Sequence, residues 1–282
     1  MTVRELLEYG NRKAHAFNKE ESAIKLLLMH FLQKESYELI MMMNEEVDKE
    51  KEDAFKQGVE LYVEKGIPVQ HIMGYVYFYG YKFMVGKDVL IPRFETEELV
   101  ANVLMAYDDF FNGQEVDVVD IGTGSGAIAI SLALEEPNMR VDATDISADA
   151  LEVARQNAAN LGVNVNFYLG DLLEPLIKLG KKYDILVSNP PYIPEDEYVE
   201  DLVKNNEPHL ALFGGKDGTA YYELILKDAK HVLKKRSIIA FEHGWNQKMK
   251  LSELINKYFP DSQYETINDI NGKDRITIIY NK

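Results

Sequence analysis

The sequence predicts an α/β protein in which a small all-helical domain precedes a Rossmann-like, doubly wound and mainly parallel sheet. Three observations support this prediction. Apolar residues recur at helical spacing up to about residue 67. From about residue 115, β-prone apolar runs alternate with amphipathic helices, as in a parallel sheet with both faces covered. The last two β-prone runs are joined by "INGKD", a turn suited to a hairpin, so we expect the last strand to be antiparallel.

Residues 1–68 are predicted to form a helical bundle. Thr2 with Glu5 has the pattern of a capping box, and Asn18 with Glu21 resembles one. A glycine and a proline near the end of this segment stop its last helix. Nothing in the segment has the pattern of a catalytic group.

A linker at residues 69–92 is predicted to contain a β-hairpin. Its sequence "GYVYFYGYKFMVG" is aromatic and β-prone, with Gly80 at the centre. The next stretch, "VLIPRFETEELVANVLMAY", passes from a strand through Pro92 into a helix, for which Thr96 is a candidate cap. Residues 93–282 then make up the second domain.

The second domain alternates strands and helices in order along the chain. Ser147 is expected to cap one of the helices and Gly162 to end it. The predicted strands span residues 116–122, 140–146, 165–171, 183–189, 237–244, 264–269 and 275–280. The predicted helices between them span residues 126–136, 147–162, 218–233 and 247–259.

Composition narrows the classes of partner. The 282 residues carry a formal net charge of −16, which disfavours direct binding to nucleic acid because Lys and Arg supply most affinity for phosphates. The chain has no cysteine, so it has no disulfide and no thiolate metal site. No apolar run is long enough to span a bilayer, and the N-terminus lacks a signal peptide's apolar core. We therefore expect a cytoplasmic protein with no membrane partner.

A glycine-rich loop, "GTGSG" at residues 122–126, lies between the first predicted strand of the sheet and the next helix. Glycine allows a tight turn and a close approach of the backbone to a ligand, and the helix start offers free N–H groups. Gly122, Gly124 and Ala127 satisfy the dinucleotide fingerprint in its Ala-ending form. Gly126 instead suggests the G-x-G-x-G loop of S-adenosylmethionine enzymes. The loop favours S-adenosylmethionine, with NAD or a purely structural turn as alternatives.

Two acidic residues lie at the ends of the next two predicted strands. Asp145 follows the glycine loop at about the separation in sequence that is typical of an acidic residue that binds ribose hydroxyls. It could also cap the following helix. Asp171 could accept a hydrogen bond from an adenine amino group, with Leu172 packing on the ring, but aspartates after strands are also common caps. Both positions fall at the carboxyl edge of the predicted sheet, where open α/β folds bind ligands.

The stretch "NPPY" at residues 189–192 follows the fourth strand at the same edge. The side-chain carbonyl of Asn189 and the backbone carbonyl of Pro190 could accept both N–H groups of a planar –NH₂. Pro190 and Pro191 stiffen the loop, and Tyr192 could stack on the flat group. This arrangement suits methyl transfer to a planar nitrogen, in which the work is mostly alignment. A plain proline turn is the alternative interpretation of this stretch taken alone.

These motifs resemble class I S-adenosylmethionine-dependent methyltransferases, and most closely the HemK/PrmC family of peptide chain release factor N5-glutamine methyltransferases. The resemblance covers nearly the whole chain, and "IPRFETE" followed by "EPHLALFGGKDG" is its most specific part. It implies a class I methyltransferase fold and methylation of the glutamine in the Gly-Gly-Gln motif of class I release factors. It also implies that the helical domain helps to dock this protein substrate and that S-adenosylhomocysteine is the second product.

The resemblance assigns roles by position. Asn189 and Pro190 hold the glutamine amide, and Tyr192 packs against it. The cofactor-contacting positions are Gly122, Thr123, Gly124, Ser125, Gly126, Asp145, Asp171, Leu172 and Asn189. One departure is Phe94, where the family usually has proline; its loss should loosen the backbone near the cofactor entrance.

Other functions are less well supported. An amino-methyltransferase acting on adenine or guanine shares the glycine loop and "NPPY", but the acidic charge and "IPRFETE" argue against it. A non-catalytic binding module would not need both motifs intact, and an NAD-dependent oxidoreductase lacks a placed proton donor. The histidines are dispersed, so we expect no metal.

Overall fold

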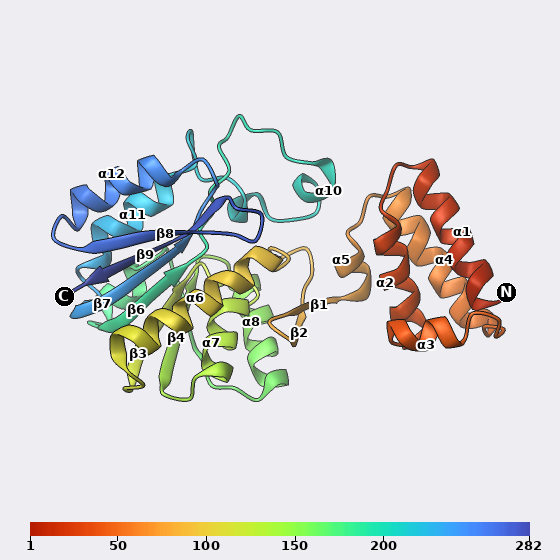
Figure 1. Ribbon diagram of the computed structural model, residues 1–282, viewed down its shortest axis with the longest axis horizontal. Helices are drawn as coiled ribbons and strands as arrows, with labels where there is room; N and C mark the ends of the chain where they lie inside the picture. Colours follow the sequence, from red (N-terminus) through yellow and green to blue (C-terminus); the bar gives the residue numbers. More distant parts are fainter. The chain divides into compact units, whose positions relative to one another are not determined.

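The computed structural model describes residues 1–282, and the chain divides into two compact units (Figure 1). The helical unit comprises residues 1–75 together with 199–206, and the second unit, hereafter the α/β unit, comprises residues 76–198 and 207–282. None of the helices combines the length and the apolar character needed to cross a membrane.

The helical unit packs its helices around an apolar core. The helices are α1 (Val3–Ala16), α2 (Glu21–Leu32), α3 (Ser36–Met41), α4 (Lys49–Val63), α5 (Val69–Met73) and α10 (Asp201–Lys204). Fully buried residues such as Leu6, Ile24, Leu28 and Phe55 form the core. The predicted helical bundle is therefore confirmed, with one short helix more than expected after Pro68.

The two predicted capping boxes of this unit differ in outcome. The one at Thr2 and Glu5 is confirmed, because each side chain bonds the other residue's backbone N–H. The one at Asn18 is wrong: Glu20 is the N-cap residue of α2, and Asn18 has a positive φ of 53° just beyond α1.

The α/β unit is built on a seven-stranded sheet with the order β5-β4-β3-β6-β7-β9-β8 (Figure 1). The strands are β3 (Val116–Ile121), β4 (Met139–Asp145), β5 (Asn166–Leu169), β6 (Tyr183–Ser188), β7 (Leu233–Glu242), β8 (Gln263–Asn268) and β9 (Asp274–Asn281). The last strand, β9, is antiparallel to both of its neighbours, and the other pairs are parallel. A two-stranded hairpin, β1 (Tyr75–Phe78) and β2 (Tyr81–Met84), precedes the sheet. The predicted fold class is confirmed.

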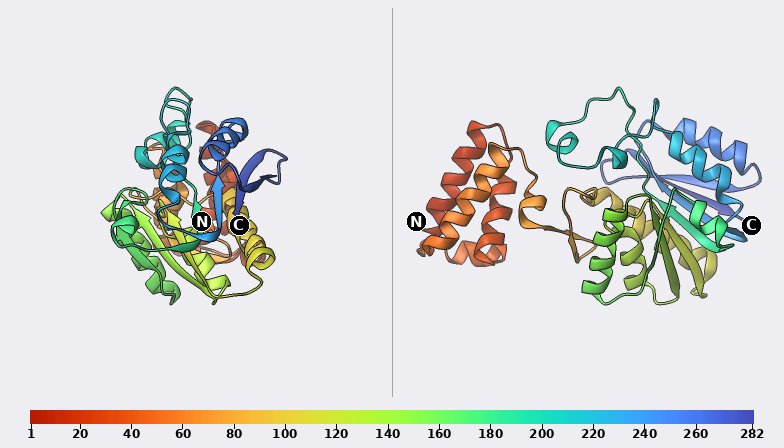
Figure 2. Two further views of the ribbon diagram at one scale, coloured as in Figure 1. Left: turned by 90° about the vertical axis from the view of Figure 1, so that its left-hand side faces the viewer. Right: turned by 180° about the vertical axis from the view of Figure 1, so that it is seen from behind.

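Helices cover both faces of the sheet, as the two further views in Figure 2 also show. One face carries α6 (Phe94–Phe111), α7 (Ala127–Glu135) and α8 (Ala148–Leu161). The other carries α9 (Glu174–Lys178), α11 (Ala220–Ala229) and α12 (Lys248–Tyr258), and a short 3₁₀ turn, His209–Ala211, lies in the loop before α11. Residues on alternate sides of the strands, such as Val118 and Val119 of β3, belong to the two separate cores.

Two sequence expectations are corrected here. The helix predicted to reach residue 233 ends at Ala229, and β7 begins at Leu233, because the backbone pairs early: Tyr183 N donates to Val232 O at 2.7 Å. Thr96 does not cap α6. Arg93 is the N-cap residue, and Thr96 lies buried in the first turn with its hydroxyl directed elsewhere.

Candidate active site

The glycine loop and the "NPPY" stretch leave the sheet side by side. They follow β3 and β6, which are paired neighbours in register Asp120 with Val187. The hydroxyl of Ser188 donates to the backbone oxygen of Ile121 at 2.7 Å and ties the two strand ends together. The carboxyl edge of the sheet therefore holds both motifs in one place, as parallel topology requires.

The glycine loop runs with positive φ at each of its glycines, and the three glycines serve different needs. A Cβ on Gly126 would lie 2.7 Å from Cδ1 of Ile130 in the same helix and 3.2 Å from Cβ of Ala154 on α8, so glycine lets the start of α7 lie close to α8. A Cβ on Gly122 or Gly124 would meet open space. The first two glycines thus leave room above the loop, and their φ values of 73° and 55° keep its turn tight.

Asp145 fixes this loop from the end of β4. One carboxylate oxygen accepts the N–H of Gly124 at 2.8 Å, and the other accepts the N–H of Ser147 at 2.9 Å. Ser147 itself caps α8, as predicted, by accepting from the N–H of Ala150. Burial raises the pKa of the Asp145 carboxyl, while these N–H donors counteract that shift. Each oxygen keeps a lone pair for a further donor.

A second carboxyl, which the sequence reasoning missed, lies under the loop. Asp120 is fully buried, and its Oδ2 accepts the hydroxyl of Thr123 at 2.6 Å. Its Oδ1 has no hydrogen-bond partner in the protein. Burial raises the pKa of Asp120 to about 7. The available signal was an aspartate in the apolar second half of the strand, two residues before the first glycine of the loop.

The residues predicted to contact adenine follow β5. Leu172 has a positive φ of 44°, and its carbonyl accepts the hydroxyl of Thr144 at 3.0 Å. Asp171 is exposed, and Gly170 just before it donates to the backbone oxygen of Asp145 at 3.0 Å. The loops after β4 and β5 are therefore joined at the edge that carries the glycine loop.

Asn189 is half-buried and is held by a chain of hydrogen bonds. Its Nδ2 donates to the hydroxyl oxygen of Thr96 at 3.1 Å, and that hydroxyl donates to Oε2 of Glu242 at 2.7 Å. The other oxygen of Glu242 faces the hydroxyl of Tyr192, 3.4 Å away. Oδ1 of Asn189 receives no hydrogen bond from the protein. The asparagine is thus left with a free acceptor beside the glycine loop.

The backbone after Asn189 is clasped by the glycines of "FGGKDG". The N–H of Gly214 donates to the backbone oxygen of Ile193 at 2.9 Å, and Nε2 of Gln247 donates to that of Tyr192 at 2.8 Å. A Cβ on Gly218 would lie 2.1 Å from the backbone oxygen of Tyr192. Glycine is required there because two backbone segments touch.

The "IPR" and "EPH" stretches meet through one carboxylate. Glu207 is 4% exposed; it accepts the N–H of Ile91 at 2.9 Å and pairs with Arg93 at 2.5 Å. The stretch before α6 is thereby anchored to the loop that follows "NPPY". Thr96 lies just after this stretch, in the first turn of α6.

Comparisons with known proteins match both parts of the chain. Residues 5–74 match the PrmC N-terminal domain family, and residues 97–216 match the methyltransferase small domain family. The release factor glutamine methyltransferase of Bacillus cereus is 44% identical over 278 residues, which cover 98% of each chain. That of Bacillus subtilis is 46% identical over 277 residues, 97% of this chain and 96% of the other. The chain belongs to the release factor glutamine methyltransferase family.

A solved structure adds a likeness in fold alone. A methyltransferase from Pyrococcus furiosus has a TM-score of 0.52 and 20% identity, covering 72% of this chain and 90% of that one. The two Bacillus relatives and the two matching family models, not this structure, confirm the family resemblance inferred from the motifs, and the chain is a methyltransferase.

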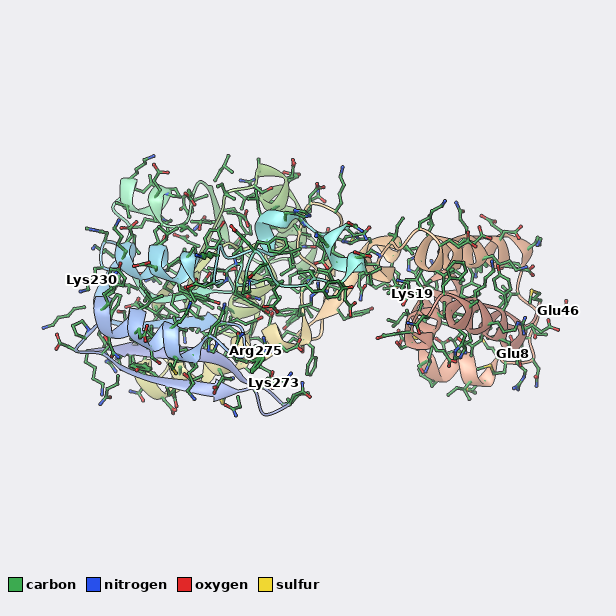
Figure 3. All side chains as sticks on the ribbon, turned by 90° about the horizontal axis from the view of Figure 1, so that it is seen from above. Glu8, Lys19, Glu46, Lys230, Lys273 and Arg275 are labelled. Carbon is green, nitrogen blue, oxygen red and sulfur yellow. The ribbon has the colours of Figure 1, made fainter.

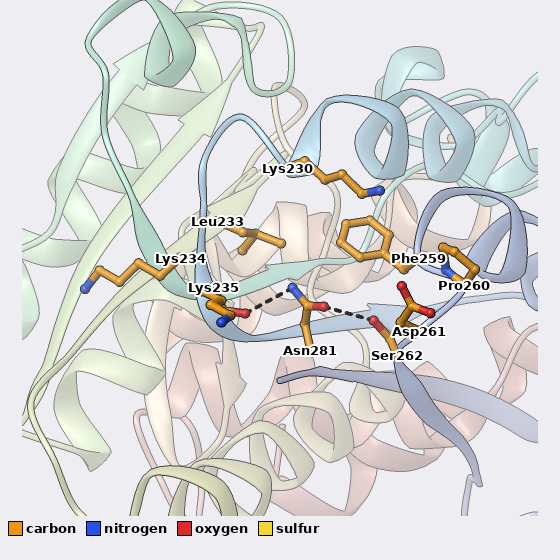
Figure 4. A pocket seen from close by; sticks show the side chains of 9 residues that line it. All are labelled: Lys230, Leu233, Lys234, Lys235, Phe259, Pro260, Asp261, Ser262 and Asn281. Atoms are coloured by element: carbon orange, nitrogen blue, oxygen red, sulfur yellow. Dashed lines mark hydrogen bonds between the residues drawn. The ribbon is translucent and has the colours of Figure 1, made fainter.

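One cavity of this methyltransferase lies away from its candidate site. A cavity of about 220 Å³ lies at the amino end of β7, far along the strand from Glu242, and Figure 4 shows its lining. Its walls include Lys230, Leu233 and Phe259. Asn281, also in the lining, accepts from Ser262 and donates to the backbone oxygen of Lys235. These are packing contacts at the edge opposite the glycine loop.

His243, next to Glu242, is a structural histidine, as expected for the histidines of this chain. It is buried, and its ring nitrogens lie 2.9 Å from the Gly244 carbonyl and 2.9 Å from the Thr277 hydroxyl. Burial lowers its pKa, which favours the neutral ring.

Proposed function

We propose that this enzyme transfers a methyl group from S-adenosylmethionine to the side-chain amide nitrogen (N5) of the glutamine in the Gly-Gly-Gln motif of class I peptide chain release factors. The modification acts on translation termination through the release factor. The observation that carries this proposal is the fixed orientation of Asn189, whose nitrogen is bonded to Thr96 and whose carbonyl oxygen is left as an acceptor. A primary amide, with two N–H donors in one plane, matches such an acceptor.

The chain has features that suit the cofactor. The open space above Gly122 and Gly124 lets a ligand approach the backbone closely. The carboxylate of Asp145 keeps lone pairs that can accept hydrogen bonds from hydroxyl groups. Oδ1 of Asp120 is buried without a partner in the protein, so a hydrogen bond from a ligand would satisfy it. The residues proposed to hold it are Gly122, Thr123, Gly124, Ser125, Gly126, Asp145, Asp171, Leu172 and Asn189. S-adenosylmethionine supplies, when bound, a methyl group on a positively charged sulfur.

The proposed chemistry rests on alignment. Asn189 Oδ1 and the Pro190 carbonyl accept the two N–H groups of the glutamine amide and point its nitrogen at the methyl group. The same acceptors stabilise the positive charge that grows on nitrogen as the N–C bond forms and the C–S bond breaks. The extra proton then leaves to solvent, so no strong base is required. Pro190 and Pro191 keep the loop rigid, and Tyr192 forms a wall for the flat amide.

The test uses labelled S-adenosylmethionine and four acceptors: a class I release factor, its Gln→Ala motif variant, DNA and RNA. We expect label on the unmodified release factor alone. Label that persists on the Gln→Ala variant would contradict the glutamine assignment, and label on DNA or RNA would favour an amino-methyltransferase of nucleic acid instead.

A further inference from the structure

Three side chains from distant parts of the sequence form one hydrogen-bonded chain in the α/β unit. Asn189 follows β6, Thr96 lies in the first turn of α6, and Glu242 ends β7. The bond from Asn189 Nδ2 to Thr96 measures 3.1 Å, and the bond from Thr96 to Glu242 Oε2 measures 2.7 Å. Thr96 and Glu242 are 5% and 1% exposed, so water does not compete for these bonds.

The direction of this chain is fixed by chemistry. An ionised carboxylate only accepts hydrogen bonds, so Glu242 takes the single proton of the Thr96 hydroxyl. The Thr96 oxygen can then only accept, and the amide atom of Asn189 that faces it must be the nitrogen. The amide of Asn189 is planar, so its oxygen points away from Thr96.

We propose that Glu242 is a positioning residue that acts through Thr96 to hold the Asn189 amide with its carbonyl oxygen toward the nitrogen that is methylated. This inference rests on the proposed function, because it assigns Asn189 the role of acceptor for the substrate amide. Glu242 is 1% exposed, so we assign it no direct contact with substrate or cofactor. Its second oxygen faces the Tyr192 hydroxyl, so one carboxylate orients both side chains that flank the two prolines.

The surroundings of Glu242 hold it without neutralising it. Arg275 on β9, labelled in Figure 3, faces it but is bonded to Asp269 and to the backbone oxygen of His243. Glu95 on α6 adds like charge. The Tyr222 hydroxyl, from α11, donates to the backbone oxygen of Glu242 at 2.9 Å and not to its carboxylate.

Protonation of Glu242 would remove the fixed direction. Burial raises the pKa of Glu242 to about 7, against the opposing effect of the Thr96 hydroxyl and the Arg275 charge. A neutral carboxyl can donate to Thr96, which can in turn donate to Asn189 and draw the amide oxygen inward. The acceptor would then be replaced by an N–H donor. The geometry therefore links the charge of Glu242 to the rate of methyl transfer.

The experiment measures methylation of a release factor by the full-length enzyme and by four variants. Thr96→Val removes the relay, Thr96→Ser keeps a hydroxyl, and Glu242→Gln removes the charge but not the shape. Glu253→Gln, an exposed glutamate of α12, is the matched control. We expect Thr96→Val and Glu242→Gln to lose about 10–100-fold in kcat, as is typical for outer partners that orient a site residue. Thr96→Ser should recover most of the loss, and S-adenosylmethionine affinity by calorimetry should stay near that of the wild type.

The pH profile separates positioning from mere structural support. At saturating S-adenosylmethionine, which suppresses the effect of Asp120 on cofactor binding, the wild-type kcat should fall as pH drops through about 7. Glu242→Gln should lack this limb. Thermal melts report whether Thr96→Val folds; should it not, Glu242→Gln decides alone.

The outcomes distinguish this inference from the proposed function. If the wild type methylates no release factor, the proposed function fails. If the wild type methylates the glutamine and Glu242→Gln keeps both full kcat and the acid limb, only the positioning role is overturned. Low kcat with an unchanged limb in Glu242→Gln, or no rescue by serine at residue 96, would also overturn it.

Discussion

Glu52 in the helical unit and Glu242 in the α/β unit are both buried glutamates, 6% and 1% exposed. Glu52 is surrounded by cations: the N-terminal ammonium at 2.7 Å, Lys56 at 2.7 Å and Lys49 at 3.1 Å. Glu242 has no cation at hydrogen-bond distance and is held by two hydroxyls. The same side chain is therefore buried under two opposite electrostatic conditions.

The two environments move the pKa in opposite directions. The hydrogen bonds from Lys56, the N-terminus and Lys49 lower the pKa of Glu52 to about 2. Burial raises that of Glu242 to about 7. A buried carboxylate that is paired with cations can be accommodated in a stable fold. A buried carboxylate without such a partner lowers the stability of the folded protein. The difference is consistent with the proposed positioning role of Glu242, whereas the cations around Glu52 stabilise its own unit.

Two threonines, Thr2 in the helical unit and Thr96 in the α/β unit, also differ in what their hydroxyl groups bind. Thr2 caps its own helix, with Glu5 completing the capping box. Thr96 is the third residue of α6, and its hydroxyl donates to Glu242 instead of to the backbone of its own helix. In the proposed site this hydroxyl serves the orientation of Asn189, whereas that of Thr2 serves its helix.

The largest effect is expected where this orientation is used. Asn189→Ala should lower kcat by at least about 10²–10³-fold, the usual cost of losing one preorganised hydrogen-bonding group at a reacting centre. S-adenosylmethionine binding should be partly retained, because the glycine loop and Asp145 are untouched. Steady-state kinetics and calorimetry on the same preparation check both points. Full activity of Asn189→Ala would show that Asn189, to which the hydrogen bonds from Glu242 and Thr96 lead, has no role in the reaction.

Next in size is the loop that holds Tyr192 against Glu242. Gly218→Ala should destabilise the protein by roughly 2–4 kcal/mol, since a Cβ would strike the Tyr192 carbonyl and φ is +75°. Gly80→Ala is the matched control: its φ is +80°, but the added Cβ meets open space, so only the backbone strain of about 1–2 kcal/mol remains. Denaturant unfolding measures the free energy of unfolding of both variants. Equal losses would show that the contact between the added Cβ and the Tyr192 carbonyl has no effect on stability.

The comparison of the two glutamates is tested by their opposite effects on stability. The folded-state pKa of Glu242 lies above its ordinary value of 4.5, so its contribution becomes unfavourable as pH rises from 4.5 to about 7. Glu242→Gln should therefore raise stability by roughly 1–3 kcal/mol at about pH 8 and change it little near pH 4. Unfolding curves at the two pH values measure this difference.

Glu52→Gln should act in the reverse sense. The pKa of Glu52 lies below 4.5, so its favourable contribution is present above that pH and is lost as pH falls toward about 2. The variant should be less stable than the wild type at neutral pH, and the difference should vanish in acid. Loss of stability in both glutamine variants at about pH 8 would erase the contrast.

The smallest effect is expected at Phe94, the first residue of α6 and 60% exposed. The first turn of a helix tolerates proline because its N–H has no partner within the helix, and Arg93 before it is already extended at ψ 155°. Phe94→Pro should therefore stabilise the uncapped start of α6 by about 0.4–1 kcal/mol. A lower thermal midpoint would indicate that the phenylalanine makes contacts that proline cannot replace.

Local patterns predicted the fold and the position of the glycine loop and of "NPPY" at the ends of neighbouring strands. The alternation of strands and helices, the glycine loop and the place of Asn189 at a strand end all follow from residues close together in the sequence. What sequence reasoning missed are contacts between distant residues. Thr96 and Glu242 are 146 positions apart, and Arg93 and Glu207 are 114 apart. Thr96 looked like a cap because its neighbours begin a helix, and only the folded sheet brings Glu242 within reach of its hydroxyl.

The most direct test of the account is to locate the methyl group. A class I release factor is incubated with the enzyme and S-adenosylmethionine, digested, and sequenced by tandem mass spectrometry. The account predicts one methyl group on the side-chain nitrogen of the Gly-Gly-Gln glutamine, formed by the wild type and nearly absent with Asn189→Ala. A methyl group on any other residue, or equal methylation by Asn189→Ala, would contradict it.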